Sequence, residues 1–280
     1  MKTLGYYNGK IDELDRIQIP MLDRACYFGD GVYDVTFSRN YNIYMLEEHV
    51  ERIFQSAKLI GICPTVTPSE LCDLLRRLIL NLDSGDQWVY FQFSRATDFR
   101  AHAFPEHPVA NLWIMMKPGA IKDTYKTLRC ISMPDTRALH CNIKSLNLLP
   151  SVLATQAAME AGADECILHR NGIVTECAHS NVSILRDGVL YTHPADCMIL
   201  AGTGRAHLIK ACHRFDIPVM EECFDLESLK QADEILLTSA SALCMRITEL
   251  DGAPIGGKAA DTVKRLQDAL LADYLSATNA

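Results

Sequence analysis

The chain has 280 residues, of which 49% are hydrophobic and 22% charged, and a formal net charge of −8 at pH 7. This composition is typical of a globular protein with a sizeable core and argues against a mainly disordered chain. The acidic surplus argues against a nucleic-acid partner, and no apolar stretch approaches the roughly 18 residues that span a bilayer. We therefore expect a protein that binds neither nucleic acid nor membrane.

The first ten residues contain glycines, tyrosines and Asn8 instead of the apolar run of a secretory signal. Eleven cysteines without CxxC spacing argue against a zinc ribbon or a disulfide framework. We interpret them as reduced thiols, and we expect a cytoplasmic protein without a metal.

The N-terminal half alternates strand and helix signals. Asn8-Gly9 predicts a hairpin, and Thr67 followed by Glu70 predicts a capping box at the start of a helix. A long loop that holds Arg100 and His102 separates two apolar runs, and loops of this length are often functional. Strands are predicted over 32–37, 43–46, 88–93 and 111–117, and a helix from about Glu47 to Gly61.

The C-terminal half is richer in strands and turns. Asn171-Gly172 and Asp187-Gly188 predict successive hairpins. The predicted strands cover 164–169, 173–176, 181–185, 189–192, 219–224, 234–239 and 244–250, and the predicted helices cover 148–161, 206–215, 226–231 and 259–274. Pro118-Gly119 interrupts the pattern, so we predict an α+β protein with an N-terminal α/β domain at 1–119, a linker at 120–125 and a C-terminal domain at 126–280.

Lys144 is the first candidate catalytic residue. It lies between Ile143 and Leu146, where an extended segment is expected to lead into a helix. A lysine partly removed from water loses its charge more easily, and its amine can then form a Schiff base with a carbonyl. A solvated lysine is the ordinary alternative for a single residue.

Other candidates are residues that could hold a phosphorylated aromatic cofactor or a carboxylate. Glu176 ends a predicted strand, where a carboxylate could keep a pyridine nitrogen protonated. Gly202-Thr203-Gly204 precedes a helix, so its backbone N–H groups could bind an anion, although a plain turn is the alternative. Arg52 and the hydroxyls near Ser239 could serve a phosphate, and Arg100 with His102 could bind a carboxylate.

Taken together, these segments resemble the fold-type IV pyridoxal-phosphate enzymes, and most closely their D-amino-acid aminotransferase branch. The resemblance covers nearly the whole chain. It lies in the segments 28–34, 48–52, 100–102, 142–149, 174–176, 180–181, 190–194 and 202–205. It implies a homodimer of two-domain chains in which the C-terminal domain has a β-barrel-like sheet and binds pyridoxal 5'-phosphate.

The resemblance also implies residue roles. Lys144 matches the lysine that carries the cofactor and moves the substrate proton, and Glu176 matches the acid at the ring nitrogen. Tyr33, Arg100 and His102 match the trap for the substrate carboxylate, with Arg100 and His102 coming from the neighbouring subunit. Arg137 matches an arginine near the cofactor. The remaining cofactor-binding positions are Arg52, Ser180, Thr203, Gly204, Ser239, Ala240 and Ser241.

The chain departs from the family at three places. Cys177-Ala178-His179 stands where relatives usually have a glycine and serines, Gly204 replaces a residue of the usual turn, and Ala240 replaces a threonine. Each lost hydroxyl would weaken phosphate binding by roughly 1.5 to 3 kcal/mol.

The expected activity is transfer of an amino group between a D-amino acid, such as D-alanine, and a 2-oxo acid such as 2-oxoglutarate. Three alternatives remain open at this point. The first is a lyase of the aminodeoxychorismate type, the second a branched-chain L-aminotransferase, and the third a protein that binds the cofactor with weak or lost turnover.

Overall fold

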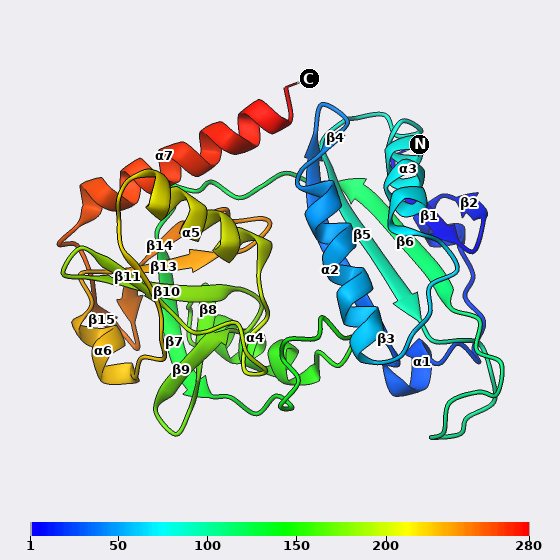
Figure 1. Ribbon diagram of the computed structural model, residues 1–280, viewed down its shortest axis with the longest axis horizontal. Helices are drawn as coiled ribbons and strands as arrows, with labels where there is room; N and C mark the ends of the chain where they lie inside the picture. Colours follow the sequence, from blue (N-terminus) through cyan, green and yellow to red (C-terminus); the bar gives the residue numbers. More distant parts are fainter. Residues whose placement is uncertain (1, 280) are drawn as a thin grey trace. The chain divides into compact units, whose positions relative to one another are not determined.

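The computed structural model describes residues 2–279, and these residues divide into two compact units (Figure 1). The first unit contains the residues up to Ala120, the segment Ile143–Asn147 and the residues from Tyr274 onward. The second contains Ile121–Asn142 and Leu148–Asp273. Two short segments from the C-terminal half therefore belong to the first unit. A division of the sequence at a single boundary cannot predict this. The predicted domain limits at 119 and 126 stay a prediction.

The first unit is built on an antiparallel sheet, in which six strands pair within the described residues in the order β2-β1-β6-β5-β3-β4. In the centre of this sheet, Tyr33 pairs with Gln92, and Gln92 pairs in turn with Trp113. The strands are β1 (Leu4–Tyr7), β2 (Lys10–Asp12), β3 (Gly31–Arg39), β4 (Asn42–Ile43), β5 (Gln87–Ser94) and β6 (Asn111–Pro118).

Helices α2 (Leu46–Leu59) and α3 (Pro68–Ile79) cover one face of this sheet, because both are strongly amphipathic. Their buried residues, among them Ile53 and Leu75, pack with Phe91 and Ile114 of the sheet. The predicted capping box is confirmed, since Thr67 and Glu70 exchange side-chain and backbone hydrogen bonds at the start of α3. Two short elements complete this unit, the 3-10 helix η1 (Leu14–Arg16) and α1 (Ala25–Phe28).

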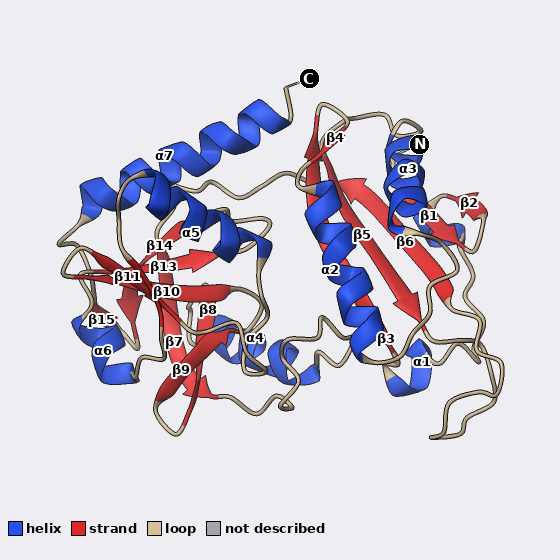
Figure 2. Cartoon of the chain, viewed as in Figure 1, coloured by secondary structure: helices blue, strands red, loops and turns tan. Residues whose placement is uncertain are grey.

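The second unit contains a mixed sheet of nine strands within the described residues, and Figure 2 shows that it is strongly curved, as in a half-barrel. Eight strands follow the order β12-β11-β10-β13-β14-β7-β8-β9, and β15 pairs with β14. The strands are β7 (Leu128–Pro134), β8 (Glu165–Arg170), β9 (Ile173–Cys177), β10 (Asn181–Arg186), β11 (Val189–Thr192), β12 (Val219–Glu221), β13 (Glu234–Thr238), β14 (Met245–Leu250) and β15 (Ala253–Pro254).

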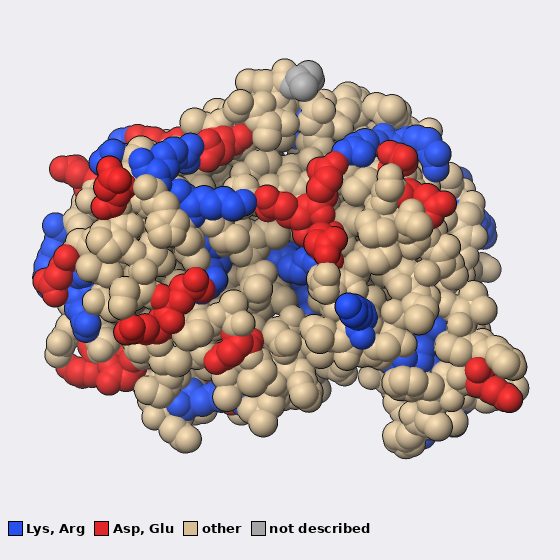
Figure 3. All heavy atoms as spheres, in the orientation of Figure 1, with Lys and Arg blue, Asp and Glu red and all other residues tan. Residues whose placement is uncertain are grey.

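Helices surround this curved sheet, and its core contains Ile167, Val182, Ile235 and Ile247. The helices are α4 (Leu149–Glu160), α5 (Thr203–Arg214), α6 (Leu226–Gln231) and α7 (Ala260–Ala277), of which α7 belongs to this unit up to Asp273. No helix of the described residues is both long and apolar enough to cross a bilayer. Acidic and basic side chains are intermixed on the face shown in Figure 3.

The α+β fold class is confirmed, but two predicted strands are too long. The strand predicted over 219–224 ends at Glu221. The strand predicted over 43–46 ends at Ile43, because Met45 adopts a left-handed backbone conformation and α2 begins at Leu46. The hairpins β8–β9 and β10–β11 form, but β9 and β10 are not neighbours in the order of strand pairing. Strand β7 was not predicted, since it pairs in parallel with both β8 and β14 and such pairing leaves no local turn signal.

Candidate active site

Lys144 lies in a short extended segment that pairs with the beginning of β3 in the first unit. Tyr33 N donates to Lys144 O at 2.9 Å, and Leu146 N donates to Gly31 O at 3.1 Å. Gly31 makes this approach possible, because a Cβ at that position would lie 2.7 Å from Leu146 Cδ1. Backbone pairing therefore fixes the position of Lys144. The segment is extended and precedes helix α4, as the sequence analysis expected.

The amine of Lys144 contacts an aromatic surface. Its Nζ lies 3.4 Å from the hydroxyl oxygen of Tyr33 and 4.4 Å from the centre of the Tyr33 ring. Tyr33 in turn stacks on Tyr90, with ring centres 5.5 Å apart. Lys144 is half-buried. The first unit therefore holds this amine against tyrosine instead of leaving it in bulk water.

Beneath this segment, a buried carboxylate holds an arginine and a histidine. Asp34 accepts hydrogen bonds from Arg52 Nε at 2.8 Å and Arg52 Nη2 at 2.7 Å, and it lies 2.7 Å from His49 Nδ1. Burial alone would raise the pKa of Asp34, but Arg52 and His49 outweigh it and hold this pKa well below its usual range. Burial lowers the pKa of His49, although Asp34 opposes it.

In the second unit, Glu176 lies near the end of β9 and is buried. Its Oε1 accepts a hydrogen bond from Arg137 Nη1, and its Oε2 accepts from Asn181 Nδ2 at 2.8 Å and Leu200 N at 3.1 Å. An acceptor-only group surrounded by three donors is stabilised in its ionised form. Glu176 is therefore a carboxylate fixed in position by its hydrogen-bond donors.

Arg137 is itself held by a second buried carboxylate. Asp135 accepts from Arg137 Nε at 3.0 Å and Nη2 at 2.8 Å, from Arg170 Nε at 3.2 Å and from the hydroxyl of Thr175 at 3.0 Å. Burial raises the pKa of Asp135, but the two arginines outweigh this effect and lower it to about 2. Asp135 thus fixes the guanidinium that contacts Glu176.

The first turn of α5 lies against the end of β13. Gly202 precedes the helix without a side-chain cap, and a Cβ on Gly204 would lie 3.1 Å from the backbone nitrogen of Ser239. The hydroxyls of Ser239 and Ser241 are 3.2 Å apart, and the Oγ1 of buried Thr238 has no hydrogen-bond partner among the described residues. Such a cradle of amides and hydroxyls suits an anion.

Ser180 and Ala240 are the other two residues predicted to bind the cofactor in the second unit. Ser180 donates its hydroxyl hydrogen to Glu165 Oε2 at 3.0 Å, and His179 Nδ1 lies 2.9 Å from the same oxygen. Ala240 has no polar side-chain group, so only its backbone can contribute to the turn between Ser239 and Ser241. The histidine that replaces a family serine is therefore tied to a buried glutamate.

Arg100 and His102 both contact Phe28 in the first unit. The Arg100 guanidinium carbon lies 4.9 Å from the centre of the Phe28 ring, and the His102 ring centre lies 5.1 Å from it. Arg24 holds their loop by donating to Ala101 O at 2.8 Å. His102 also lines a hollow of about 300 Å³. No contact between Tyr33 and either Arg100 or His102 occurs among the described residues.

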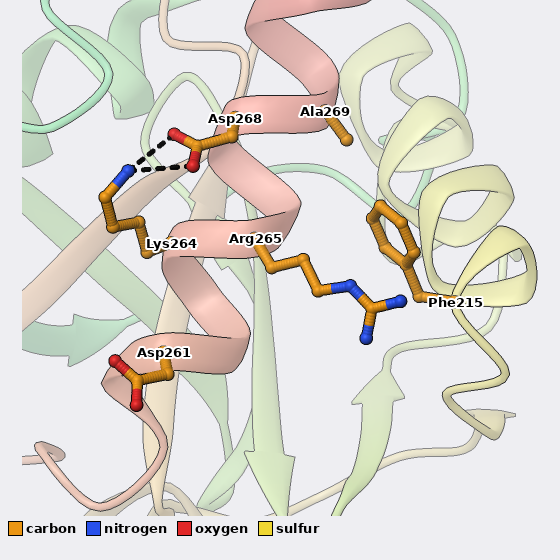
Figure 4. Close-up of a pocket in the computed structure, with 6 residues that line it drawn as sticks. All are labelled: Phe215, Asp261, Lys264, Arg265, Asp268 and Ala269. Atoms are coloured by element: carbon orange, nitrogen blue, oxygen red, sulfur yellow. Dashed lines mark hydrogen bonds and ion pairs between the residues drawn. The ribbon is translucent and has the colours of Figure 1, made fainter.

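A larger hollow, of about 460 Å³, lies on the second unit between α7 and the end of α5 (Figure 4). Arg265 lies over the ring of Phe215 at 4.0 Å, and Lys264 pairs with Asp268 at 2.7 Å. None of the predicted site residues lines it. The described residues also contain no group of histidines, cysteines and acids arranged to hold a metal.

The sequence analysis missed the two carboxylates that position the arginines. Asp34 follows Tyr33 in a strand, and Asp135 follows a proline at the end of β7. Neither has a distinctive motif: Asp34 meets Arg52 only after folding, and Asp135 is joined by Arg137 two residues away and by the distant Arg170. The alternation of apolar Tyr33, Val35 and Phe37 with polar Asp34 and Thr36 predicts instead a solvent-facing Asp34, so the sequence of this strand does not reveal its burial.

Comparisons with known proteins identify the family of this chain. The sequence model described as Amino-transferase class IV matches residues 31–250. The chain is 37% identical over 267 residues to D-alanine aminotransferase of Staphylococcus epidermidis, covering 94% of each chain. It is 35% identical over 283 residues to D-alanine aminotransferase of Bacillus licheniformis, covering 99% of each.

Solved structures share the fold. The branched-chain amino acid aminotransferase of Escherichia coli superposes with a TM-score of 0.88 at 21% identity, covering 98% of this chain and 95% of that one. The branched-chain aminotransferase of Thermoproteus uzoniensis gives a TM-score of 0.86 at 24% identity, covering 98% and 97%. At such identities the superpositions establish the architecture alone.

Proposed function

The chain belongs to the class IV aminotransferases, which are pyridoxal-phosphate enzymes, and we propose that it moves an amino group between a D-amino acid, such as D-alanine, and a 2-oxo acid such as 2-oxoglutarate. The identity to D-alanine aminotransferases over at least 94% of the chain carries this proposal. The sequence Arg100-Ala101-His102 supports it, since the resemblance assigns this pair to the D-amino-acid branch.

The described residues fit the cofactor. The end of β13 has a buried hydroxyl at Thr238 that is unpartnered within residues 2–279 and two hydroxyls at Ser239 and Ser241, and the first turn of α5 lies against Ser239, which gives donors suited to a phosphate. When bound, pyridoxal phosphate supplies an aldehyde carbon that takes the amino group and a ring that accepts electron density from the substrate. The protein supplies attachment, orientation and proton transfer.

In the first unit, we propose Lys144 as the amine that attaches the cofactor and moves the proton at the substrate Cα. Its contact with the Tyr33 hydroxyl supports this role, because the tyrosine oxygen orients Nζ through a hydrogen bond. We propose Arg52 as a phosphate ligand. Asp34 holds it through Nε and Nη2, which fixes the plane of the guanidinium.

In the second unit, we propose Glu176 as the acceptor for the protonated ring nitrogen. Its three donors favour the ionised form, so it can stabilise a positive ring without taking its proton. Arg137 then acts by holding Glu176 in place. The proposed phosphate-binding residues are Thr203, Gly204, Ser239, Ala240 and Ser241, while Ser180 is proposed to support the ring site through its bond to Glu165.

We propose that Tyr33, Arg100 and His102 bind the substrate carboxylate, and that Arg100 and His102 act on the site of a second subunit. A homodimer is supported by α4, which exposes Leu149, Val152, Leu153 and Met159 at helical spacing. Small-molecule amino and oxo acids are the substrates of this enzyme class. A cytoplasmic location is supported by the eleven cysteines, all of which are free thiols.

Mixing the purified, cofactor-loaded protein with single amino acids tests this function. D-Alanine is expected to convert the visible absorption of bound pyridoxal phosphate to that of pyridoxamine phosphate, and L-alanine is not. Addition of 2-oxoglutarate should restore the original spectrum and yield D-glutamate. Conversion by L-leucine instead would favour a branched-chain enzyme, pyruvate release from aminodeoxychorismate would favour a lyase, and an unchanged spectrum would favour a protein without turnover.

A further inference from the structure

One face of the first unit's sheet carries aromatic side chains, and it is the face opposite to α2 and α3. Cross-strand pairing places Tyr33, Gln92 and Trp113 side by side on it. Tyr90 stacks between Tyr33 and Trp88, with ring centres 5.5 Å and 5.4 Å away. The residues Tyr33, Trp88, Tyr90, Gln92 and Trp113 are called the aromatic face below.

Gln92 is a polar residue in the middle of this aromatic face, and only one end of its amide is bonded. Its Oε1 accepts a hydrogen bond from the Tyr90 hydroxyl at 2.5 Å. Its Nε2 has no hydrogen-bond partner among residues 2–279, although the residue is only 3% exposed. Buried amide donors are nearly always bonded, so an orphaned one calls for a missing partner.

The hydrogen bond with Tyr90 occupies the carbonyl end of the amide, because the Tyr90 hydroxyl donates to Gln92 Oε1. The amide NH₂ is then the end that remains for a ligand. An amide NH₂ is a donor only, so the missing partner must be an acceptor.

The surrounding groups favour an acceptor that carries negative charge. Lys144 Nζ lies against Tyr33, and Lys117 Nζ lies 5.0 Å from the ring centre of Trp88. The nearby carboxylate of Asp23 is buried, and it already accepts bonds from Ser94, Asn111 and Trp113. Near Gln92 the aromatic face thus combines one cation, the Lys144 amine beside Tyr33, with one unused donor and flat rings, which suits a small organic anion.

We propose that Gln92 is a substrate-binding residue whose Nε2 donates a hydrogen bond to a carboxylate oxygen of the amino-acid or oxo-acid substrate. Tyr90 is a positioning residue that holds the amide by its other end. This inference rests on the proposed function, because the ligand is the carboxylate of a transaminase substrate. It adds a polar contact to the expected trap of Tyr33, Arg100 and His102.

Two variants of the loaded enzyme test this contact. Gln92→Met keeps the length of the side chain and removes the donor, and Gln92→Glu replaces the donor by a charged acceptor. Gln87→Met is the matched control, since Gln87 is a buried glutamine of the same strand whose Nε2 donates to Ser84 O at 2.7 Å. Gln87 lies five residues from Gln92, or about 17 Å along a strand.

Tryptophan fluorescence gives a binding readout that does not depend on turnover. The chain has two tryptophans, and both Trp88 and Trp113 belong to the aromatic face. The probes are propionate and glutarate, two carboxylates that lack an amino or oxo group and do not react. Steady-state kinetics with D-alanine and 2-oxoglutarate is measured in parallel.

We expect about tenfold weaker binding of both probes by Gln92→Met and a larger loss for Gln92→Glu, because a hydrogen bond to a charged group contributes about one order of magnitude. KM should rise with little change in kcat, and the melting temperature and the cofactor absorption should stay at the wild-type values. Gln87→Met should bind the probes within twofold of wild type.

The inference falls if Gln92→Met binds both probes within twofold of wild type, or if Gln87→Met loses as much affinity as Gln92→Met. Tyr90→Phe gives a second test should a Gln92 variant fail to fold. It frees the amide and should weaken probe binding by a few fold, and unchanged binding would contradict the positioning role. A wild-type protein without amino transfer would refute the proposed function instead, which these binding titrations do not measure.

Discussion

The two compact units each place an arginine against a buried aspartate, but they build the pair differently. In the first unit Asp34 lies on β3, and His49 and Arg52 lie one turn apart on α2, whose apolar side chains pack in the hydrophobic core. In the second, Asp135 and Arg137 are two residues apart in an irregular segment after β7, and Arg170 closes the cluster from β8. The first clamp depends on a strand and a helix, and the second on local chain geometry.

The two aspartate–arginine pairs also differ in their burial and in the residues that they hold. The Asp34 carboxylate is fully buried and its arginine is 15% exposed. Removal of one partner would therefore lower the free energy of unfolding, because it leaves a buried charge without its counter-ion. In the Asp135 cluster, Arg137 donates a hydrogen bond to Glu176, which also accepts hydrogen bonds from Asn181 and Leu200. The first cluster holds Arg52, the proposed phosphate ligand, and the second holds Glu176, the proposed partner of the ring nitrogen.

The helix N-termini differ in the same way. Helix α3 of the first unit satisfies its own first amides with the capping box of Thr67 and Glu70. Helix α5 of the second unit begins after Gly202 with no side-chain cap. An uncapped terminus leaves N–H groups to an anion, which is what a phosphate-binding turn requires.

The largest expected effect comes from Lys144→Ala, which removes the amine of the first unit and leaves Glu176 of the second unchanged. The variant should lose the visible absorption of lysine-attached pyridoxal phosphate and all measurable amino transfer. Lys58→Ala, an exposed lysine of α2, is the control and should keep both. A Lys144→Ala protein that keeps this visible absorption, and in which mass analysis after borohydride reduction finds the cofactor bound to another lysine, would show that a different residue attaches it.

Next in size is Asp34→Asn, which breaks the buried clamp of the first unit. Leaving Arg52 without its counter-ion should lower the free energy of unfolding by about 3–5 kcal/mol, as for other buried pairs that lose one charge. Urea unfolding measures this loss. Asp15→Asn, at an exposed aspartate, should change stability by no more than about 0.5 kcal/mol. Equal stability of Asp34→Asn and wild type would remove the distinction between the two clamps.

A smaller and pH-dependent effect is expected for Asp135→Asn. The folded pKa of Asp135 is lowered to about 2, so its contribution to stability is complete above the ordinary aspartate pKa and is lost as the pH falls toward 2. The difference in unfolding free energy between wild type and variant, about 1–3 kcal/mol near neutral pH, should therefore shrink between about pH 4 and pH 2. A difference that stays constant over this range would contradict the assignment.

The smallest effect concerns the capped helix. Thr67→Ala removes one half of the capping box and should lower the free energy of unfolding by about 1 kcal/mol. Ser69→Ala, on the same exposed turn, should be close to neutral. Cofactor affinity should stay at the wild-type value in both variants, because the cap serves α3 alone. Weaker cofactor binding by Thr67→Ala would contradict the claim that the cap of α3 has no effect on the cofactor site.

Local signals were sufficient for most elements of the fold. Hydrophobic spacing located α2 and α3, and Asn-Gly and Asp-Gly turns located two hairpins of the second unit. The motifs around Lys144, Glu176 and Gly202 identified the enzyme family. Local signals failed at β7, whose pairing partners are distant in sequence, and at Asp34, Asp135 and Gln92, whose roles depend on which side chain reaches them.

The sequence by itself determined most element types and the enzyme class, because periodicity, turn residues and ordered motifs are local properties of the chain. Only the tertiary structure decided that segment 143–147 pairs with β3, that two aspartates clamp two arginines, and that one amide donor of Gln92 stays unbonded. Hydrogen bonds between residues distant in the chain depend on distances of a few tenths of an ångström, and those distances are fixed only when strands and helices have packed.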